Sequence, residues 1–169
     1  MKLAMLQTPT ALKEASVSPE ASVETRTRLV NRRAIILCAL LASAATVVSA
    51  GSGYMTLYND ARSHLNIARH VTDSLTPGLA QLGSVWLPLP HLLMAPLAAN
   101  DVLWHSGVAG AIVGGFAFVY SGVRLFGLVE EWTGSHIAAW CAMLAYALNL
   151  NLLYVQSTAL TEPVLLACL

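Results

Sequence analysis

Charged residues are gathered in short clusters along the chain, and long windows between them contain no Asp, Glu, Lys or Arg. The uncharged windows are Ala34–Asn59, Ser74–Asn100, Val102–Val123 and Trp132–Thr161. A helix needs about 20 consecutive apolar residues to cross a bilayer. The pattern therefore predicts an all-α, polytopic transmembrane protein, with spans at about 34–54, 102–123 and 134–154 and the start of another at 163.

The segment before the first apolar window sets the expected orientation. Residues 1–30 mix Ala, Ser, Thr, Pro and Glu without a usable period, which predicts a disordered cytoplasmic tail. The window is preceded by Arg26, Arg28, Arg32 and Arg33. Positive residues beside a span stay in the cytoplasm, so the first span is expected to run outward and to lead into an external loop at about 55–101. A cleaved signal peptide is the alternative, because Val48-Ser49-Ala50 has the small residues of a cleavage site.

Charge, histidine and helical spacing meet in the stretch Leu57–Pro77. Its apolar residues recur at three- and four-residue steps: Leu57, Ala61, Leu65, Ala68, Val71 and Leu75. A polar stripe has the same spacing: Arg62, Asn66, Arg69 and Asp73. The two stripes predict an external amphipathic helix that lies along the membrane interface. Asn59 or Asp60 is expected to cap its first turn, and Pro77-Gly78 to end it.

The segment Trp86–Ala99 decides the topology. It is apolar but short, and it contains Pro88, Pro90 and Pro96. Stretches of ten to fourteen apolar residues are more often re-entrant or interfacial than spanning. Prolines inside a spanning helix would also interrupt its hydrogen bonds. We therefore favour an arrangement in which this segment does not cross the membrane.

In this arrangement the span over 102–123 runs inward and the span over 134–154 runs outward. Arg124 then lies in the cytoplasm, as positive residues prefer. Glu162 reaches the same external side as Asp60. If Trp86–Ala99 did span, Arg124 would lie outside and Glu162 inside.

Two carboxylates thus fall on one predicted face of the membrane, each near a helix end. Asp60 beside the positive end of a helix dipole stays ionised. Glu162 precedes Pro163, which suits the first turn of a helix. Helix capping would explain either acid alone. Their convergence makes a shared catalytic site the favoured hypothesis.

Three further side chains are candidates for substrate binding. His64 lies one turn after Asp60 on the same helix face, so the two can share a ligand or a metal ion, unless His64 is only an interfacial polar residue. Arg69 can face a phosphate, although its spacing from Asp73 favours a surface ion pair. His91 stands among prolines at membrane depth, where polar groups are costly and often functional, or it points to the interface.

Composition excludes some classes of protein. Apolar residues make up 56% of the chain, charged residues 11%, and the formal net charge is zero. Mean hydropathy is +0.63. A balanced charge without a basic patch argues against nucleic-acid binding. The three cysteines lie in apolar windows without metal-ligand spacing, as packing residues do.

Small residues in the second predicted span indicate close helix packing. Ser106, Gly110 and Gly114 stand four apart, a spacing that lets membrane helices approach closely. The last apolar run, Val164–Leu169, is too short to cross a membrane. The sequence is therefore expected to be the first part of a longer protein.

The order of these motifs resembles the membrane-embedded type C glycosyltransferases, which include protein O-mannosyltransferases, the lipid A aminoarabinose transferase and the oligosaccharyltransferase catalytic subunit. In that superfamily an external loop opens with an acid on a juxtamembrane helix, as Tyr58-Asn59-Asp60-Ala61 does here. An apolar piece with prolines follows, similar to Trp86–Leu93. A span ends in a basic-Leu-Phe-Gly turn, like Arg124–Gly127, and a second acid precedes a helix, like Thr161-Glu162-Pro163-Val164-Leu165. The resemblance covers about Arg32 to Leu169.

The resemblance implies a truncated N-terminal part of a glycosyltransferase in the cytoplasmic membrane. It implies transfer of a sugar, such as mannose or a similar hexose, from a polyprenyl-phosphate donor to an external acceptor. Asp60 would take the acceptor's proton, and Asp60 and Glu162 would hold Mg²⁺ or Mn²⁺. His64, Arg69 and His91 would contact the substrate. The alternative is a transporter or a non-catalytic membrane subunit, and a transporter would be expected to place ionisable residues within its spans.

Overall fold

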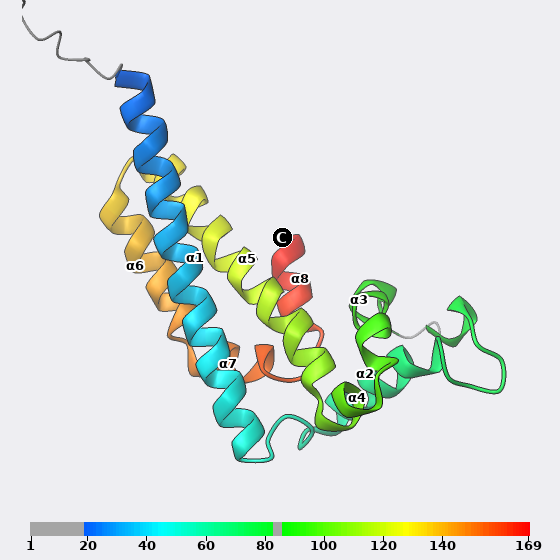
Figure 1. Cartoon of the computed structure of the whole chain (residues 1–169). Coiled ribbons are helices and arrows are strands. Elements are labelled where there is room, and N and C mark those ends of the chain that lie inside the picture. Colours follow the sequence, from blue (N-terminus) through cyan, green and yellow to red (C-terminus); the bar gives the residue numbers. More distant parts are fainter. Residues whose placement is uncertain (1–18, 83–85) are drawn as a thin grey trace, which may run out of the picture.

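The computed structural model describes residues 19–82 and 86–169, and within them the chain forms helices without strands (Figure 1). The all-α prediction is confirmed. The elements in chain order are α1 (Pro19–Gly51), α2 (Asn59–His70), the 3₁₀ turn η1 (Leu79–Leu82), α3 (Pro88–Ala98), α4 (Asp101–Ser106), α5 (Val108–Thr133), α6 (His136–Ala147), α7 (Leu150–Gln156) and α8 (Glu162–Cys168).

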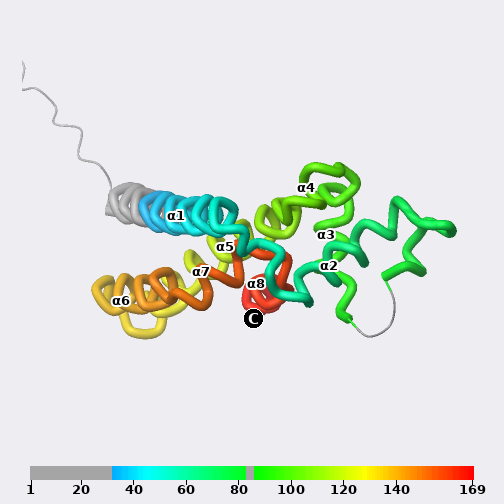
Figure 2. The backbone as a smooth tube through the Cα atoms, turned by 90° about the horizontal axis from the view of Figure 1, so that it is seen from below, coloured from blue at the N-terminus to red at the C-terminus, as the bar shows by residue number. Residues whose placement is uncertain are grey.

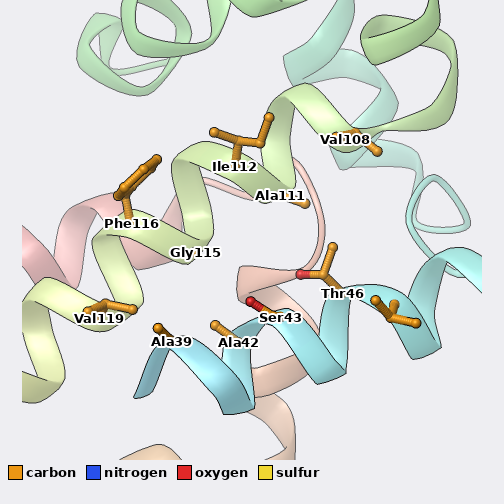
Figure 3. Close-up of a pocket in the computed structure, with 11 residues that line it drawn as sticks. Ala39, Ala42, Ser43, Thr46, Val108, Ala111, Ile112, Gly115, Phe116 and Val119 are labelled. Carbon is orange, nitrogen blue, oxygen red and sulfur yellow. The ribbon is translucent and has the colours of Figure 1, made fainter. Parts of the chain in front are cut away.

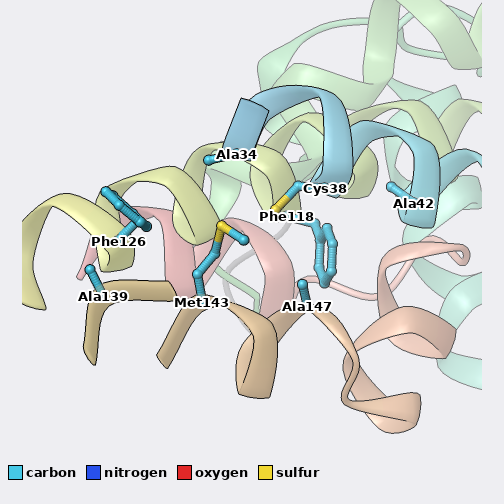
Figure 4. Close-up of a cluster of buried hydrophobic side chains, with 8 residues drawn as sticks. All are labelled: Ala34, Cys38, Ala42, Phe118, Phe126, Ala139, Met143 and Ala147. Carbon is cyan, nitrogen blue, oxygen red and sulfur yellow. The ribbon is translucent and has the colours of Figure 1, made fainter. Parts of the chain in front are cut away.

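Two helices are long and apolar enough to cross a membrane: the Arg32–Gly51 part of α1, and α5. At about 1.5 Å per residue, the 26 residues of α5 extend about 39 Å, more than the hydrocarbon core of a bilayer. The two helices run antiparallel, and α6 packs beside them (Figure 1). Their shared core is a row of small and aromatic side chains that includes Cys38, Phe118 and Met143 (Figure 4).

The helix that corresponds to the second predicted span differs from the predicted range of 102–123. Gly107 adopts a left-handed backbone, φ 82°, which ends the short helix α4 and lets α5 begin at Val108. The helix then continues to Thr133, where Gly134 ends it with φ 63°. Arg124 through Gly127 therefore lie inside a helix and not in a turn. The expected basic-Leu-Phe-Gly turn is wrong, because helix-favouring residues follow Gly127 without a break.

The third predicted span, over 134–154, is also not one continuous helix. Helices α6 and α7 together are apolar enough to cross a membrane, but they meet at an angle of 61°. The bend lies at Asn149, whose side-chain oxygen accepts hydrogen bonds from the backbone N–H of Asn151 and Leu152 and so starts a new helix. The apolar pattern alone does not show that a side chain in the middle of the window caps a new helix.

Two helix boundaries in the first half of the chain differ from the predicted ones. Helix α1 begins at Pro19, so the part of the predicted disordered tail from residue 19 on is helical. Proline suits the first turn of a helix, and the following residues contain no further proline or glycine before Gly51. The predicted tail before residue 19 lies outside the described residues. The helix expected over Leu57–Pro77 ends at His70, and the chain after it forms a turn closed by a hydrogen bond from Gly78 N–H to the Val71 carbonyl.

The segment expected as an external loop forms a separate arm beside the bundle (Figure 2). Helices α2 and α3 pack on each other within it, and α4 leads back to α5. Helix α3 has 11 residues and reaches only about 17 Å, too little to cross a bilayer. Pro88 and Pro90 stand in its first turn, where backbone N–H groups need no helical partner, and Pro96 lies within it near its end.

Two glycines of α5 let the segment between α7 and α8 pack closely against α5. A Cβ on Gly110 would overlap Ala159, and a Cβ on Gly114 would overlap the Gln156 carbonyl. The small-residue spacing therefore does serve close packing, as predicted, although its partner is the α7–α8 connection. Ser106 does not share this role, because it belongs to α4.

Candidate functional site

Asp60 lies in the first turn of α2 and is half-buried. The N-cap of this helix is Tyr58, and its side chain makes no capping hydrogen bond. The prediction that Asn59 or Asp60 caps the helix is therefore wrong, because both residues already lie inside the first turn. The Asp60 carboxylate still stands at the positive end of the helix dipole. Helix capping therefore does not explain why an acid occupies this position.

Glu162 is the first residue of α8 and is exposed, and Pro163 follows it in the first turn as expected. Thr161 precedes the helix without a capping hydrogen bond from its side chain. The connection before it is fixed by the contact of Ala159 with Gly110. Ala159 belongs to the same buried cluster as Ala61 of α2 and Ala109 of α5. The fold thus brings the start of α8 to the arm that carries Asp60, and both views show α8 on that side of α5 (Figures 1 and 2).

A buried pair of histidines lies between α2 and α3. Nδ1 of His64 is 2.9 Å from Nε2 of His91, and the two side chains are only 2% and 0% exposed. Nδ1 of His91 is 3.1 Å from the carbonyl oxygen of Leu87. The ring of Trp86 meets His64 edge to face, with the ring centroids 4.8 Å apart. His64 is therefore held on two sides.

The hydrogen bonds fix the protons of this pair when both rings are neutral. A carbonyl oxygen only accepts, so His91 carries its proton on Nδ1 and has a lone pair on Nε2. His64 must then donate from Nδ1 and keep its lone pair on Nε2. Burial lowers the pKa of both histidines, which favours the neutral rings.

Two carboxylates act on the same ring. The negative charges of Asp60 and, to a smaller extent, Glu162 raise the pKa of His64 and partly offset the effect of burial. The geometric link between the two acids is a buried cluster in which Ala61, next to Asp60, packs with Ala159, three residues before Glu162.

Arg69 is already fully engaged. Its guanidinium donates to Asp73 and to the carbonyl oxygens of Ala98 and Ala99, and it forms an ion pair of 2.7 Å with Asp101. The predicted pair with Asp73 is confirmed. All guanidinium N–H groups of Arg69 are used in these contacts, so none is left to bind a phosphate. The contacts join α2 to the α3–α4 junction.

Apolar cavities flank α8. One of about 270 Å³ lies between the start of α3 and α8 and reaches from Trp86 to Thr161. A second of about 570 Å³ continues along α3, α5 and α8. The two share Leu89, Val164 and Cys168, so they form one apolar tract that leads to the start of α8. A third cavity, of about 370 Å³, lies between α1 and α5 and is lined by small residues such as Ala39, Ser43 and Gly115 (Figure 3).

Several contributors to this end of the molecule escaped the sequence reasoning. Gln156, Ser157 and Thr158 are fully buried although their side chains are polar. Ser157 shares a hydrogen bond of 2.6 Å with Ser49 of α1, and the Gln156 amide donates to the Ala42 carbonyl. A polar triplet near the end of the uncharged window Trp132–Thr161 was the only signal, and the sequence could not distinguish a buried role from a loop.

The structure adds no further side-chain ligand to the predicted metal site at Asp60 and Glu162. Within the described residues, no three His, Cys, Asp or Glu side chains converge as a cation site would need. Asp60 and Glu162 would have to share a cation with oxygen atoms from a substrate.

The chain matches no protein-family model, no curated protein and no solved structure. The resemblance to type C glycosyltransferases therefore rests on the order of motifs alone. One of those motifs, the turn at Arg124–Gly127, is absent from the fold.

Proposed function

We propose that this chain carries the acidic end of a membrane transferase that moves a sugar from a polyprenyl-phosphate donor to an acceptor at the membrane surface. The single observation that carries the proposal is the buried cluster in which Ala61, the neighbour of Asp60, packs with Ala159, three residues before Glu162. The order of motifs in the sequence supports the type C glycosyltransferase class.

The chemistry needs a base beside a weak nucleophile. An acceptor hydroxyl gains reactivity when a carboxylate takes its proton as the new bond forms. Asp60 is half-buried in the first turn of α2, so it is accessible to a substrate while α2 holds it in place. We assign it the role of general base. Glu162 is exposed at the start of α8, and we assign it the orientation of the acceptor or the donor head group.

The apolar tract suits a donor with a hydrocarbon tail. It runs along α8 between α3 and α5 and reaches Thr161, one residue before Glu162. A polyprenyl chain in this tract would bring its phosphate to the end of α8. Burial of such a chain contributes about 25 cal/mol for each Å² of apolar surface removed from water.

A divalent cation between Asp60 and Glu162 is a separate prediction. Mg²⁺ or Mn²⁺ binds carboxylate and phosphate oxygens, and Asp60 and Glu162 would be its ligands in the chain. The effect of a chelator on sugar transfer, followed by restoration with added Mg²⁺ or Mn²⁺, tests it.

A transporter is the second candidate, and one observation favours it. Helices α6 and α7 form a broken pair bent by 61°, and discontinuous helices build the substrate sites of many transporters. However, the described ionisable side chains of that pair number only His136, Cys141, Tyr146 and Tyr154. The two candidate acids lie outside this pair, Asp60 on α2 and Glu162 at the start of α8, which favours the transferase.

The experiment is a transfer assay in membranes from cells that express the native gene, with a polyprenyl-phosphate hexose as donor. Asp60→Asn should lower turnover by about a hundredfold or more, as loss of a general base does. Glu162→Gln should also lower it, whereas Glu131→Gln, an exposed acid on α5, should not. Unchanged turnover in Asp60→Asn removes Asp60 as the base.

A further inference from the structure

We propose that the chain binds one anionic phospholipid, with its phosphodiester in a polar pocket beside Arg62 and an acyl chain in the groove between α1 and α5. Neither Asp60 nor Glu162 lines the pocket or the groove. The inference requires only that α1 and α5 cross the membrane, so its test is independent of sugar transfer.

The pocket lies where the α1–α2 connection, α2 and α4 meet, and its volume is about 240 Å³. Six residues line it: Thr56, Arg62, Leu65, Asn66, Trp104 and His105. The α1–α2 connection packs tightly against the start of α5, because a Cβ on Gly107 would lie 2.9 Å from Cγ2 of Thr56. The walls of the pocket therefore come from segments that the fold holds together.

Hydrogen bonds inside the pocket occupy its acceptors and leave donors. Nε of Arg62 donates to the Thr56 carbonyl at 2.7 Å. Nε1 of Trp104 donates to Oδ1 of Asn66 at 3.2 Å. An indole N–H only donates, so the oxygen of Asn66 faces it and the amide NH₂ group remains. Among the described residues, no hydrogen bond uses this NH₂ group or the two terminal nitrogens of Arg62. The pocket thus offers donors to a ligand that accepts.

Arg62 supplies the positive charge of the pocket. Within the part of the chain that the structure describes, it belongs to no ion pair, whereas Arg69 on the same polar stripe is paired with Asp73 and Asp101. A guanidinium that donates through two nitrogens matches two oxygens of a phosphate. A phosphodiester, which carries a negative charge and several acceptor oxygens, therefore fits this set of donors.

Trp104 gives the pocket a fixed wall. Its ring centroid is 4.3 Å from that of His105, and the guanidinium carbon of Arg69 lies 5.1 Å from its centroid. The hydrogen bond to Asn66 holds the indole on a third side. Tryptophan is enriched at the level where a spanning helix leaves the membrane, so its presence here suits a site at the lipid head groups.

The ends of the two long helices place the pocket at that level. Helix α1 ends at Gly51, shortly before Thr56, and α5 begins at Val108, shortly after His105. The polar head groups of a bilayer lie just outside its hydrocarbon core. Basic pockets beside spanning helices bind the head groups of anionic lipids. The position therefore favours a membrane lipid over a soluble phosphate as the ligand.

A groove for an acyl chain begins beside the pocket. The cavity of about 370 Å³ between α1 and α5 extends from Val108, the first residue of α5, to Val119 (Figure 3). Small residues such as Ala42 and Gly115 line it, which leaves room for methylene groups. Burial of these groups adds to the affinity for a lipid but not for a soluble phosphate.

Native mass spectrometry of the full chain tests the head-group site, with dioleoyl phosphatidylglycerol added to the detergent micelles. We expect one retained lipid per chain. Arg62→Ala should weaken its binding by about tenfold to a hundredfold, the usual effect of losing hydrogen bonds to a charged group. Arg124→Ala, which removes an exposed arginine of α5 that lines neither cavity, should keep the wild-type affinity. Equal binding by the wild type and Arg62→Ala, or equal losses in the two variants, would overturn the proposal.

Arg62→Lys guards against a variant that has lost its fold, because lysine keeps the charge and a long apolar stem. Its affinity should lie between those of the wild type and Arg62→Ala, since an ammonium group lacks the planar fork of a guanidinium. Weaker binding by Arg62→Lys than by Arg62→Ala would contradict a phosphate contact at this position.

Ser43→Leu tests the groove. Ser43 is exposed and lines the groove, whereas Ala44 is equally exposed but does not line it. Ser43→Leu should weaken the binding of phosphatidylglycerol by about tenfold, as when about two methylene groups leave an apolar site. Ala44→Leu should leave the affinity unchanged. Equal effects of the two substitutions would contradict an acyl chain between α1 and α5.

Two further probes separate the possible sources of the phosphate. Dioleoylglycerol, which lacks the phosphate, should bind more weakly than phosphatidylglycerol, and inorganic phosphate in large excess should not displace the lipid. Displacement by inorganic phosphate would indicate a site for the free anion. Equal binding of dioleoylglycerol would show that the head group is not recognised. Either result overturns the proposal and leaves the roles of Asp60 and Glu162 to the transfer assay.

Discussion

Gly110 of α5 lies directly against Ala159, so closely that a Cβ on Gly110 would overlap both Cα and Cβ of the alanine. This contact sets where the chain runs before α8, and with it where Glu162 stands. Gly114 makes a similar approach to the Gln156 carbonyl one turn further on. The end of α5 that carries these glycines thereby links α8 to the arm that holds Asp60.

Gly110→Ala should destabilise the chain by about 1–3 kcal/mol, the usual cost of forcing extra atoms into a packed site. The obstacle is backbone as well as side chain, so rotation of a side chain cannot relieve it. Unfolding in mixed detergent micelles, followed by helical circular dichroism, measures the change.

Gly127→Ala is the matched control in the same helix, because nothing lies within 4 Å of a Cβ there. Alanine is favoured over glycine in a helix by about 1 kcal/mol, so this variant should be slightly more stable. Equal effects of the two substitutions would show that Gly110 is not in a close contact.

Asn149→Ala should weaken the bend between α6 and α7. The Asn149 side chain caps α7 through two backbone N–H groups, and loss of such a cap costs about 1 kcal/mol. Asn151→Ala is the control, since the exposed Asn151 joins this cap only through its backbone. Spin-label distances between the far ends of the two helices should lengthen in Asn149→Ala, and an unchanged distance would mean that the bend has another cause.

Stability should fall as the solution becomes acidic, and the histidine pair should account for part of the fall. Burial lowers the pKa of His64 and His91 in the folded chain. Between the unfolded value of about 6.5 and the lower folded values, the unfolded chain binds more protons. The stabilisation is thus complete above about pH 6.5 and is lost as the pH falls toward the folded values.

Unfolding midpoints measured from pH 8 to pH 5 test this dependence. The double variant with His64→Gln and His91→Gln should show a flatter profile, whereas His70→Gln, which alters an exposed histidine on the same helix, should keep the wild-type slope. An identical slope in the double variant would contradict the buried neutral pair.

Arg69→Lys should loosen the arm even though it keeps the charge. The guanidinium reaches acceptors on Asp73, Ala98, Ala99 and Asp101 at once, and an ammonium group cannot match that geometry. Amide hydrogen exchange should become faster in α2 and at the α3–α4 junction. Arg62→Lys, whose arginine bonds only the Thr56 carbonyl among described residues, should change exchange little.

The sequence was most informative where a pattern extends over many residues. The uncharged windows led to α1 and α5, and the two stripes of Leu57–Pro77 led to α2. Ends and breaks were harder, because each depends on one residue: the left-handed Gly107 delays α5, and Asn149 divides the third apolar window. A hydropathy pattern does not reveal a single capping side chain or a single residue with a left-handed backbone.

The candidate site was predicted in part. Asp60, His64, His91 and Glu162 were singled out, and the fold joins His64 to His91 by a hydrogen bond. The hydrogen bond between the histidines could not be predicted, since it joins residues of two helices whose packing is set by Ala61, Ala68 and Met94. The pair of Arg69 with Asp73 was predicted, but its contacts with the Ala98 and Ala99 backbone carbonyls were not, because no sequence pattern marks them.

The central claim is that Asp60 and Glu162 share one side of the membrane, and cysteine labelling tests it most directly. In a chain with Cys38, Cys141 and Cys168 replaced by alanine, single cysteines are placed at Asp60, Glu162 and Glu131. Glu131 lies near the opposite end of α5. An impermeant maleimide added outside sealed cells should label positions 60 and 162 and should reach position 131 only after the membrane is opened. Labelling of 60 and 162 from opposite sides would contradict the account.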